Sequence, residues 1–268
     1  MKKKLLIIIL IAAVVIAAWL AFCGYQWSWG PFVKLHDVKT ASLEGNGEKY
    51  SLDNTPENAD SPIEGKTVLF LGSSVTYGSA SGGVSFADYI GKRDGCEMIK
   101  SAVSGTTLVE SGIDSYVSRL KKLDAEKADL LVCQLSTNDA SQKKELGKII
   151  ESKNLNDFDT KTIAGAIEYI ICYSKEKWNC PVIFYTNPRY DSDLYGEMVD
   201  ILKEAEAKWG ISVIDMWNDA ELNAALNKNT ALYMADKIHP TKAGYREIWT
   251  PFMEREIFAV MSAKEVKE

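Results

Sequence analysis

The amino-acid sequence predicts an α/β protein with three α/β/α layers around a five-stranded parallel sheet in flavodoxin-like order, preceded by an N-terminal transmembrane helix. Three observations predict this fold class. Five short predicted strands alternate along the chain with longer segments of helical periodicity. The third of them, 129–135, is nearly all apolar, as expected of a strand in a parallel sheet that helices cover on both faces. At 268 residues and 46% hydrophobic content, the chain is long enough to form one substantial core.

The N-terminus carries the membrane signal. Three lysines precede an uncharged stretch, Leu5 to Phe22, and about 20 apolar residues span a bilayer with the flanking lysines on the cytoplasmic side. We expect residues 1–23 to be an uncleaved signal anchor and the rest of the chain to be extracytoplasmic. The alternatives are a cleaved signal peptide, disfavoured because the stretch is long and lacks a small-x-small site, and lipidation at Cys23, disfavoured because Phe22 occupies a position where a small residue is expected.

A polar spacer follows the apolar stretch. Residues 24–64 show no strand or helix periodicity, and their Gly, Asn and Pro content is typical of loops. We expect an extracytoplasmic linker with one short structured piece at His36–Ser42, in which His36 is solvated rather than catalytic. Trp27, Trp29 and Phe32 are the aromatic residues expected at the membrane interface.

The folded domain is expected over residues 65–262, with a polar tail at 263–268. Its strands are predicted at 67–71, 97–103, 129–135, 181–186 and 211–216. Its helices are predicted at 85–93, 113–123, 159–178, 194–209 and 241–261, the last kinked by Pro251. The polar connection at 140–158 has a length that is typical of lids, binding loops or disorder.

Charge and cysteine content exclude several classes of protein. The net charge of -6 disfavours nucleic-acid binding, which depends on clustered Lys and Arg. With two histidines in the chain and no cluster of metal-ligand residues, we expect neither a metal nor a cofactor. Five cysteines do not make a disulfide framework for a domain of this size, although a Cys172–Cys180 disulfide is an alternative in an oxidising exterior.

Polar turns follow the predicted strands at the places where chemistry would be expected. Ser73 and Ser74 end the first strand, and His239 follows the fifth strand, preceded by Asp236. The carboxyl ends of parallel strands open onto one crevice, so these groups lie on the same edge of the sheet. A serine needs a base to become a nucleophile, and His239 is the only imidazole of the folded region. Asp236 is close enough to orient it.

Two further turns offer donors for an oxyanion. Gly105 follows the second strand, where its backbone N–H is accessible, and Asn138 follows the third, where its amide is available. Each turn alone is usually structural, because Ser, Asn and Asp commonly cap helices and turns. Their occurrence after successive strands, in an order that can converge, is what points to a catalytic site.

These blocks resemble the SGNH, or GDSL-type, hydrolase superfamily of esterases and lipases. The matching blocks are GSSVTYG at 72–78, Ser104-Gly105, Ser136-Thr137-Asn138-Asp139 and Asp236-Lys237-Ile238-His239. The resemblance covers residues 66–258 and implies that Ser74 is the nucleophile, His239 the base and Asp236 its orienting acid. It also implies an oxyanion hole made by Ser74 N–H, Gly105 N–H and the Asn138 side chain.

The chain departs from the family pattern at two positions. Ser73 replaces the aspartate of Gly-Asp-Ser, and Ser136 replaces the glycine of Gly-x-Asn-Asp. Neither position belongs to the triad, so the departures affect the local backbone and the substrate fit more than the reaction type.

The resemblance and the anchor together predict a membrane-tethered extracytoplasmic serine esterase that acts on small acyl esters, and we expect these to be O-acetyl groups of glycans. Arg189, Tyr190 and Tyr77 are candidate substrate-binding residues, with a surface ion pair and core packing as the alternatives. Alternative functions are a lysophospholipase or thioesterase, an acyltransferase, and a catalytically silent glycan-binding module. The oligomeric state does not follow from the sequence.

Overall fold

The computed structural model describes residues 2–27, 30–32 and 34–265. The sheet contains β1 (Thr67–Gly72), β2 (Glu97–Ala102), β3 (Leu130–Gln134), β4 (Val182–Tyr185) and β5 (Ser212–Ile214). All neighbouring strands pair in parallel, in the order β2-β1-β3-β4-β5. This is the flavodoxin-like order, so the predicted fold class is confirmed.

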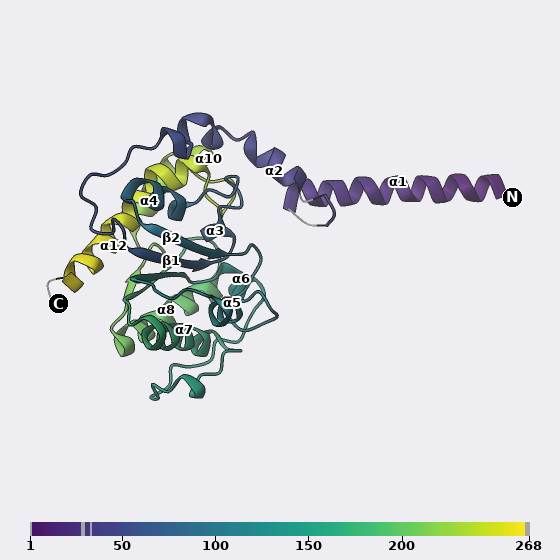
Figure 1. Cartoon of the computed structure of the whole chain (residues 1–268). Coiled ribbons are helices and arrows are strands. Elements are labelled where there is room, and N and C mark those ends of the chain that lie inside the picture. The colour runs from purple at the N-terminus through teal and green to yellow at the C-terminus, as the bar shows by residue number, and fades with distance from the viewer. Residues whose placement is uncertain (1, 28–29, 33, 266–268) are drawn as a thin grey trace.

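Two helical layers cover the sheet (Figure 1). One layer contains α5 (Tyr116–Lys122), α7 (Ile163–Trp178) and α8 (Asp193–Trp209), and it packs on Leu69 and Leu71 of β1. The other contains α4 (Phe86–Asp94) and α12 (Thr250–Glu265), and it packs on Val68 and Phe70. Successive side chains of a strand point to opposite faces, which is why neighbouring residues of β1 serve different cores.

Short elements complete the domain. They are α3 (Ser74–Tyr77), α6 (Thr137–Ser141), α9 (Ala220–Lys228), α10 (Thr230–Tyr233) and α11 (Lys242–Gly244), with a 3-10 turn at Leu155–Asp157. The predicted helices at 113–123 and 159–178 begin later than expected, because Ser115 and Thr162 accept hydrogen bonds from the first turns as N-caps.

The C-terminal helical segment is continuous but changes its pitch. A π-helical turn, Tyr245–Trp249, comes immediately before α12, and Pro251 lies in the first turn of α12. A proline cannot donate the hydrogen bond of a regular helix interior, and the wider turn ends just before it. In place of a simple kink, the structure has this π-helical turn, and α12 continues to Glu265, into the expected polar tail.

The polar connection at 140–158 is anchored on α7 and α8. Buried Glu168 accepts a hydrogen bond from the Ile150 N–H at 3.1 Å and pairs with Lys208. Leu146 and Ile149 pack against the same core layer as α7 and α8. The connection therefore covers the outer helices. Cys172 and Cys180 are free thiols in the structure.

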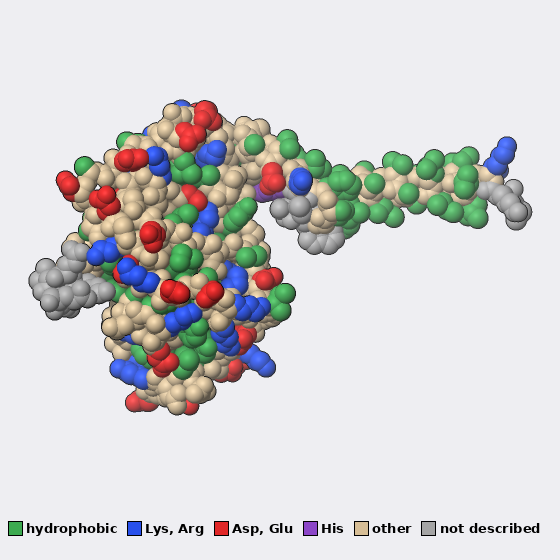
Figure 2. Space-filling model, viewed as in Figure 1, with side chains coloured by type: hydrophobic (Ala, Val, Ile, Leu, Met, Phe, Trp, Pro, Cys, Tyr) green, Lys and Arg blue, Asp and Glu red, His purple; other side chains and the backbone are tan. Residues whose placement is uncertain are grey.

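An N-terminal helix, α1 (Lys2–Trp27), precedes the domain, and its residues Lys3–Tyr25 are long and apolar enough to cross a membrane. A signal sequence meets the same criteria of length and composition. Figure 2 shows hydrophobic side chains over the length of α1, in contrast to the mixed surface of the domain. The expected interface residue Trp29 lies outside the described residues.

The expected linker contains helix α2 (Lys34–Ala41) and three 3-10 turns, Glu44–Asn46, Glu48–Tyr50 and Leu52–Asn54. We call residues 40–55 the strap, because they lie on the folded domain. Asn46 donates a hydrogen bond to the Ala80 carbonyl at 2.7 Å and accepts one from the Lys242 N–H at 2.8 Å. Tyr50 is buried, and its carbonyl accepts a hydrogen bond from the Tyr89 hydroxyl at 2.5 Å. This part of the spacer is packed structure.

Candidate active site

The first strand delivers two serines to the carboxyl edge of the sheet. β1 is buried along its whole length and ends at Gly72, and α3 begins at Ser74. A Cβ atom at Gly72 would lie 1.7 Å from the Thr76 hydroxyl oxygen, so only glycine permits this tight turn. Ser74 is 7% exposed, so it is largely buried but still reaches solvent.

A chain of hydrogen bonds joins the three residues predicted as a triad. The Ser74 Oγ lies 2.8 Å from His239 Nε2. On the other side of the ring, His239 Nδ1 lies 2.8 Å from one carboxylate oxygen of Asp236 and 3.0 Å from the other. A proton on Nδ1 leaves Nε2 free to accept the serine proton, which is the arrangement that general-base catalysis requires.

The loop that carries His239 is held by its own aspartate. The Asp236 carboxylate accepts hydrogen bonds from the N–H groups of Ile238 and His239, both at 2.8 Å. Burial raises the pKa of the Asp236 carboxyl, but the hydrogen bonds and charge of His239 outweigh it and lower the pKa to about 2. Buried Asn187 adds a bond from its amide to the Ile238 carbonyl at 3.2 Å. Asp236 is therefore an anion that fixes both the ring and the loop.

Ser73 is held by a glutamine from the neighbouring strand. Gln134 Oε1 accepts hydrogen bonds from the Ser73 N–H at 2.9 Å and from the Ser73 hydroxyl at 3.3 Å. The same oxygen accepts a bond from the Thr76 hydroxyl at 2.9 Å. All three residues are fully buried. The amide oxygen of Gln134 thus fixes the turn beside Ser74 in a chain that lacks the family aspartate there. Gln134 was not predicted, although a polar residue that ends an apolar strand is a usable signal.

The loop after β2 and the turn after β3 are tied together. The Asn138 side-chain amide donates a hydrogen bond to the Thr106 carbonyl at 2.9 Å, which leaves its second N–H available. The buried Asp139 carboxylate accepts bonds from the Leu108 and Val109 N–H groups at 2.7 and 3.1 Å. Burial raises the pKa of this carboxyl, and these hydrogen bonds act against that shift.

Gly105, in the loop after β2, carries a backbone N–H that is not used in the described part of the fold. Its φ of +79° lies in the left-handed region that favours glycine, and a Cβ atom there would meet nothing within 4 Å. Among the residues that the structure describes, neither the Gly105 nor the Ser74 N–H donates a hydrogen bond to a protein acceptor. Unpaired N–H groups beside a nucleophile are what an oxyanion hole requires.

Arg119 holds three segments of this edge in place and was missed by the sequence reasoning. Its guanidinium donates to the Gly72 carbonyl at 2.6 Å, to the Ser101 carbonyl and hydroxyl, and to the Thr106 hydroxyl at 3.4 Å. Burial lowers the pKa of this group. Within the described chain, Arg119 forms no ion pair with a carboxylate. Its charge is therefore directed at the carboxyl ends of β1 and β2.

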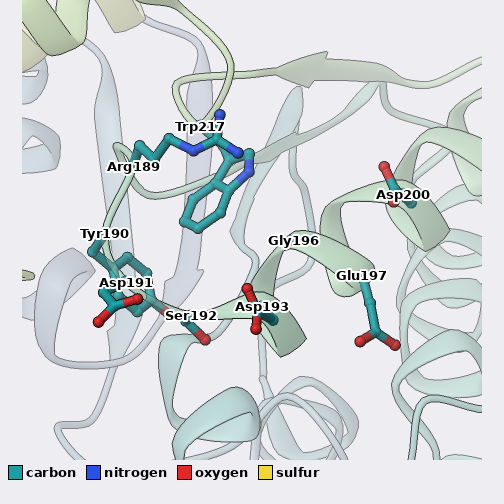
Figure 3. A pocket seen from close by; sticks show the side chains of 9 residues that line it. All are labelled: Arg189, Tyr190, Asp191, Ser192, Asp193, Gly196, Glu197, Asp200 and Trp217. Atoms are coloured by element: carbon teal, nitrogen blue, oxygen red, sulfur yellow. The ribbon is translucent and has the colours of Figure 1, made fainter.

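Arg189 and Tyr190 line two hollows, one of which is shown in Figure 3. The Arg189 guanidinium lies 5.0 Å from the centre of the Trp217 ring, and Tyr190 packs on the same ring at 5.5 Å. One hollow, of about 630 Å³, is lined by Arg189, Tyr190, Trp217 and four carboxylates. The other, of about 290 Å³, reaches from Arg189 and Tyr190 to Asp236. Both predicted residues thus border a hollow that includes a triad residue.

Tyr77 is placed differently. It ends α3, is 43% exposed, and its ring lies 5.7 Å from the Lys100 ammonium. Its hydroxyl is directed toward Gly83, at 3.4 Å from where a Cβ atom of that glycine would be.

The described residues contain no group of three or more His, Cys, Asp or Glu side chains that could hold a metal ion.

Comparison with known proteins identifies the family. A model of the GDSL-like lipase/acylhydrolase family matches residues 70–247, which include every predicted triad and oxyanion residue. A search of curated proteins gave no match.

Solved structures show the same fold. A Lactobacillus plantarum protein has 20% sequence identity and a TM-score of 0.60, covering 75% of this chain and 98% of its own. A Bacteroides ovatus protein named as a GDSL-like lipase has 16% identity and a TM-score of 0.55, covering 72% and 98%. A family two carbohydrate esterase from Clostridium thermocellum, solved with cellohexaose, has 14% identity and a TM-score of 0.50, covering 77% and 66%. The predicted family resemblance is confirmed: the chain belongs to the GDSL-like lipase/acylhydrolase family and is an enzyme that hydrolyses ester bonds.

Proposed function

We propose that this enzyme is an extracytoplasmic serine esterase, tethered to the membrane by α1, that removes small acyl groups, chiefly O-acetyl, from carbohydrates. The observation that carries the proposal is the unbroken chain of hydrogen bonds from Ser74 through His239 to Asp236. Each contact is within the range in which a proton moves between a nucleophile and its base.

The reaction follows from these contacts. Ser74 Oγ attacks the ester carbonyl carbon while His239 Nε2 takes the serine proton, and Asp236 stabilises the imidazolium. The negative charge on the carbonyl oxygen is met by the N–H groups of Ser74 and Gly105 and by the Asn138 amide. The alcohol leaves with the proton from His239. Water, deprotonated by the same imidazole, then attacks the acyl-enzyme and releases the acid and Ser74.

The carbohydrate part of the proposal rests on the hollow beside Asp236. Its volume is about 290 Å³, and its lining includes Asn227 and Thr230, whose amide and hydroxyl suit sugar hydroxyl groups. The same lining includes the apolar side chains of Leu226 and Met234, and a hollow of this size suits a short acyl group on a sugar better than a long hydrocarbon chain.

Full-length protein in detergent or vesicles provides the test. We expect hydrolysis of p-nitrophenyl acetate and of acetylated glucose, with Ser74→Ala lowering kcat at least about 10⁴-fold. Ser152→Ala, at a serine remote from the triad, is the matched control. Equal rates for Ser74→Ala and wild type would refute the serine mechanism. A rate that rises steadily from acetyl to dodecanoyl esters would instead support a lysophospholipase or thioesterase.

A further inference from the structure

Exposed apolar side chains of the folded domain gather on the edge that carries the triad. Outside residues 1–32, the described residues include five exposed large hydrophobic side chains, and four of them form a set that we call the catalytic rim: Val38 (67% exposed), Tyr77 (43%), Val103 (39%) and Ile113 (73%). Tyr77 follows the nucleophile, and Val103 and Ile113 lie in the loop that carries Gly105. The fifth, Ile150, lies in the polar connection on α7 and α8. Single exposed apolar residues are common on protein surfaces, but three of these five lie in the segments that follow the carboxyl ends of β1 and β2, and Val38 lies on α2, just before the strap.

The membrane-spanning helix is tied to the same edge. Figure 1 shows α1 leaving the domain on the side where α3 and α6 follow the strand ends. The strap fixes this arrangement, because Asn46 bonds to Ala80, six residues after the nucleophile, and to Lys242, three residues after His239. The backbone of Gly45 lies against the Leu232 carbonyl of α10, 1.9 Å from where a Cβ atom would stand.

A short connection and a direct contact keep α2 beside α1. Residues 28–33 separate the two helices, and six extended residues reach about 20 Å at most. α2 also packs back on α1: the Lys39 ammonium lies 5.4 Å from the centre of the Tyr25 ring.

α2 is in turn close to the catalytic residues. Burial and the charge of Lys39 lower the pKa of the His36 imidazole, and the charges of His239 and Asp236 also act on it. His36 is half-buried rather than solvated as predicted. The strap follows α2 directly and reaches the segment after His239 through the bond between Asn46 and Lys242, so the chain that starts at the end of α1 leads to the loop of the triad.

We propose that the catalytic rim rests on the lipid bilayer that α1 crosses, so that the active site opens toward the membrane surface and acts on esters of molecules attached to that surface. The proposal rests on the proposed membrane tether and on the proposed esterase site. Apolar side chains at such a position insert among lipid headgroups, as in other interfacial proteins. A long soluble polymer would have to enter between the domain and the bilayer, whereas a lipid-attached ester reaches the opening by diffusion in the membrane.

Photo-crosslinking of the full chain in phosphatidylglycerol and phosphatidylethanolamine vesicles tests the surface without using activity. A benzophenone amino acid at Ile113 should form lipid adducts, as should one at Ile16 within α1. The matched control is Lys127, an exposed residue just before β3 and hence on the opposite edge of the sheet. Adducts at Ile16 but not at Ile113, or equal adducts at Ile113 and Lys127, would overturn the proposal. Absence of adducts at Ile16 would remove the tether and overturn it as well.

A kinetic comparison tests the substrate class. The probes are an O-acetylated stearyl glucoside in the vesicles and O-acetylated glucose in solution. Ile113→Asp should lower the rate on the vesicle substrate about tenfold and leave the soluble rate within about twofold, because a charge there disfavours contact with the bilayer. An equal effect on both substrates, or on neither, would refute the proposal. Failure of the esterase site would appear separately, as rates unaffected by Ser74→Ala, and would leave the crosslinking result standing.

Discussion

Replacing Asp236 by asparagine separates the two roles of this side chain, which are to hold the backbone of its loop and to orient the His239 ring. In the structure, one carboxylate oxygen accepts the backbone N–H groups of Ile238 and His239, both at 2.8 Å, and the other lies 2.8 Å from His239 Nδ1. The asparagine oxygen can keep both backbone bonds. Its NH₂ group, however, can only donate a hydrogen bond to the ring. Nδ1 of His239 must then accept that hydrogen bond, and the ring proton moves to Nε2.

That tautomer cannot take the proton of Ser74. We expect kcat to fall about 10³- to 10⁴-fold, equivalent to about 4 to 5.5 kcal/mol of transition-state stabilisation. The unfolding free energy should change by no more than about 1 kcal/mol, because the Asp236 side chain is 51% exposed and its ion pair with His239 is screened by solvent. The loss is therefore catalytic rather than structural.

The assay is steady-state hydrolysis of p-nitrophenyl acetate, paired with urea unfolding of the same preparations. Asp159→Asn is the matched control, since Asp159 also accepts a backbone N–H within its own turn, from Lys161 at 3.0 Å, far from the triad. An Asp236→Asn enzyme within tenfold of the wild-type kcat would refute the role given to the carboxylate. So would a loss of activity fully explained by unfolding.

Three further predictions concern the same edge of the sheet. Asn138→Ala should lower kcat about 10²- to 10³-fold with little change in KM, because it removes an oxyanion donor along with the bond to Thr106; an unchanged kcat would contradict that role. Arg119→Met should lower the unfolding free energy by about 2 to 3 kcal/mol in urea titrations, because it leaves the Gly72 carbonyl without its charged donor. Arg119→Lys should not restore the wild-type unfolding free energy, since lysine lacks the planar guanidinium that reaches several acceptors at once. The Asp236 pKa lies near 2, below its ordinary value of 3.8, so the stability that the carboxylate adds is present above about pH 4 and is lost as the pH falls through 2. The difference in unfolding free energy between wild type and Asp236→Asn should follow the same pH dependence. A difference that vanished already at pH 6 would contradict this prediction.

The sequence was sufficient for the strands and for the residues that end them. β1, β3 and β4 are buried, largely apolar runs with polar turns at their carboxyl ends, and both features are local. The five predicted strands differ from the observed ones by at most two residues at either end. The meeting of Ser74, His239 and Asp236 required one more step, the shared edge of a parallel sheet.

The supporting residues could not be found in this way. Gln134 acts on a backbone N–H far away in sequence, and Arg119 binds carbonyl groups, which every residue possesses. A polar residue at the end of an apolar strand draws attention to Gln134, but no pattern in the sequence identifies the backbone groups that Gln134 and Arg119 bind. The same reason applies to the spacer: Gly45 and Asn46 have loop composition, and composition does not distinguish a solvated loop from 3-10 turns packed on a domain.

The strap decides where a water-soluble fragment of this enzyme can begin. A cut at residue 60, after the polar spacer, would remove Asn46 and leave the Lys242 N–H and the Ala80 carbonyl without their partner. It would also uncover the Tyr89 hydroxyl, which donates to the Tyr50 carbonyl. A cut before α2 retains these bonds. Truncation scanning should therefore give a sharp loss of soluble, active product between residues 34 and 60, inside a segment whose composition suggests that it is dispensable.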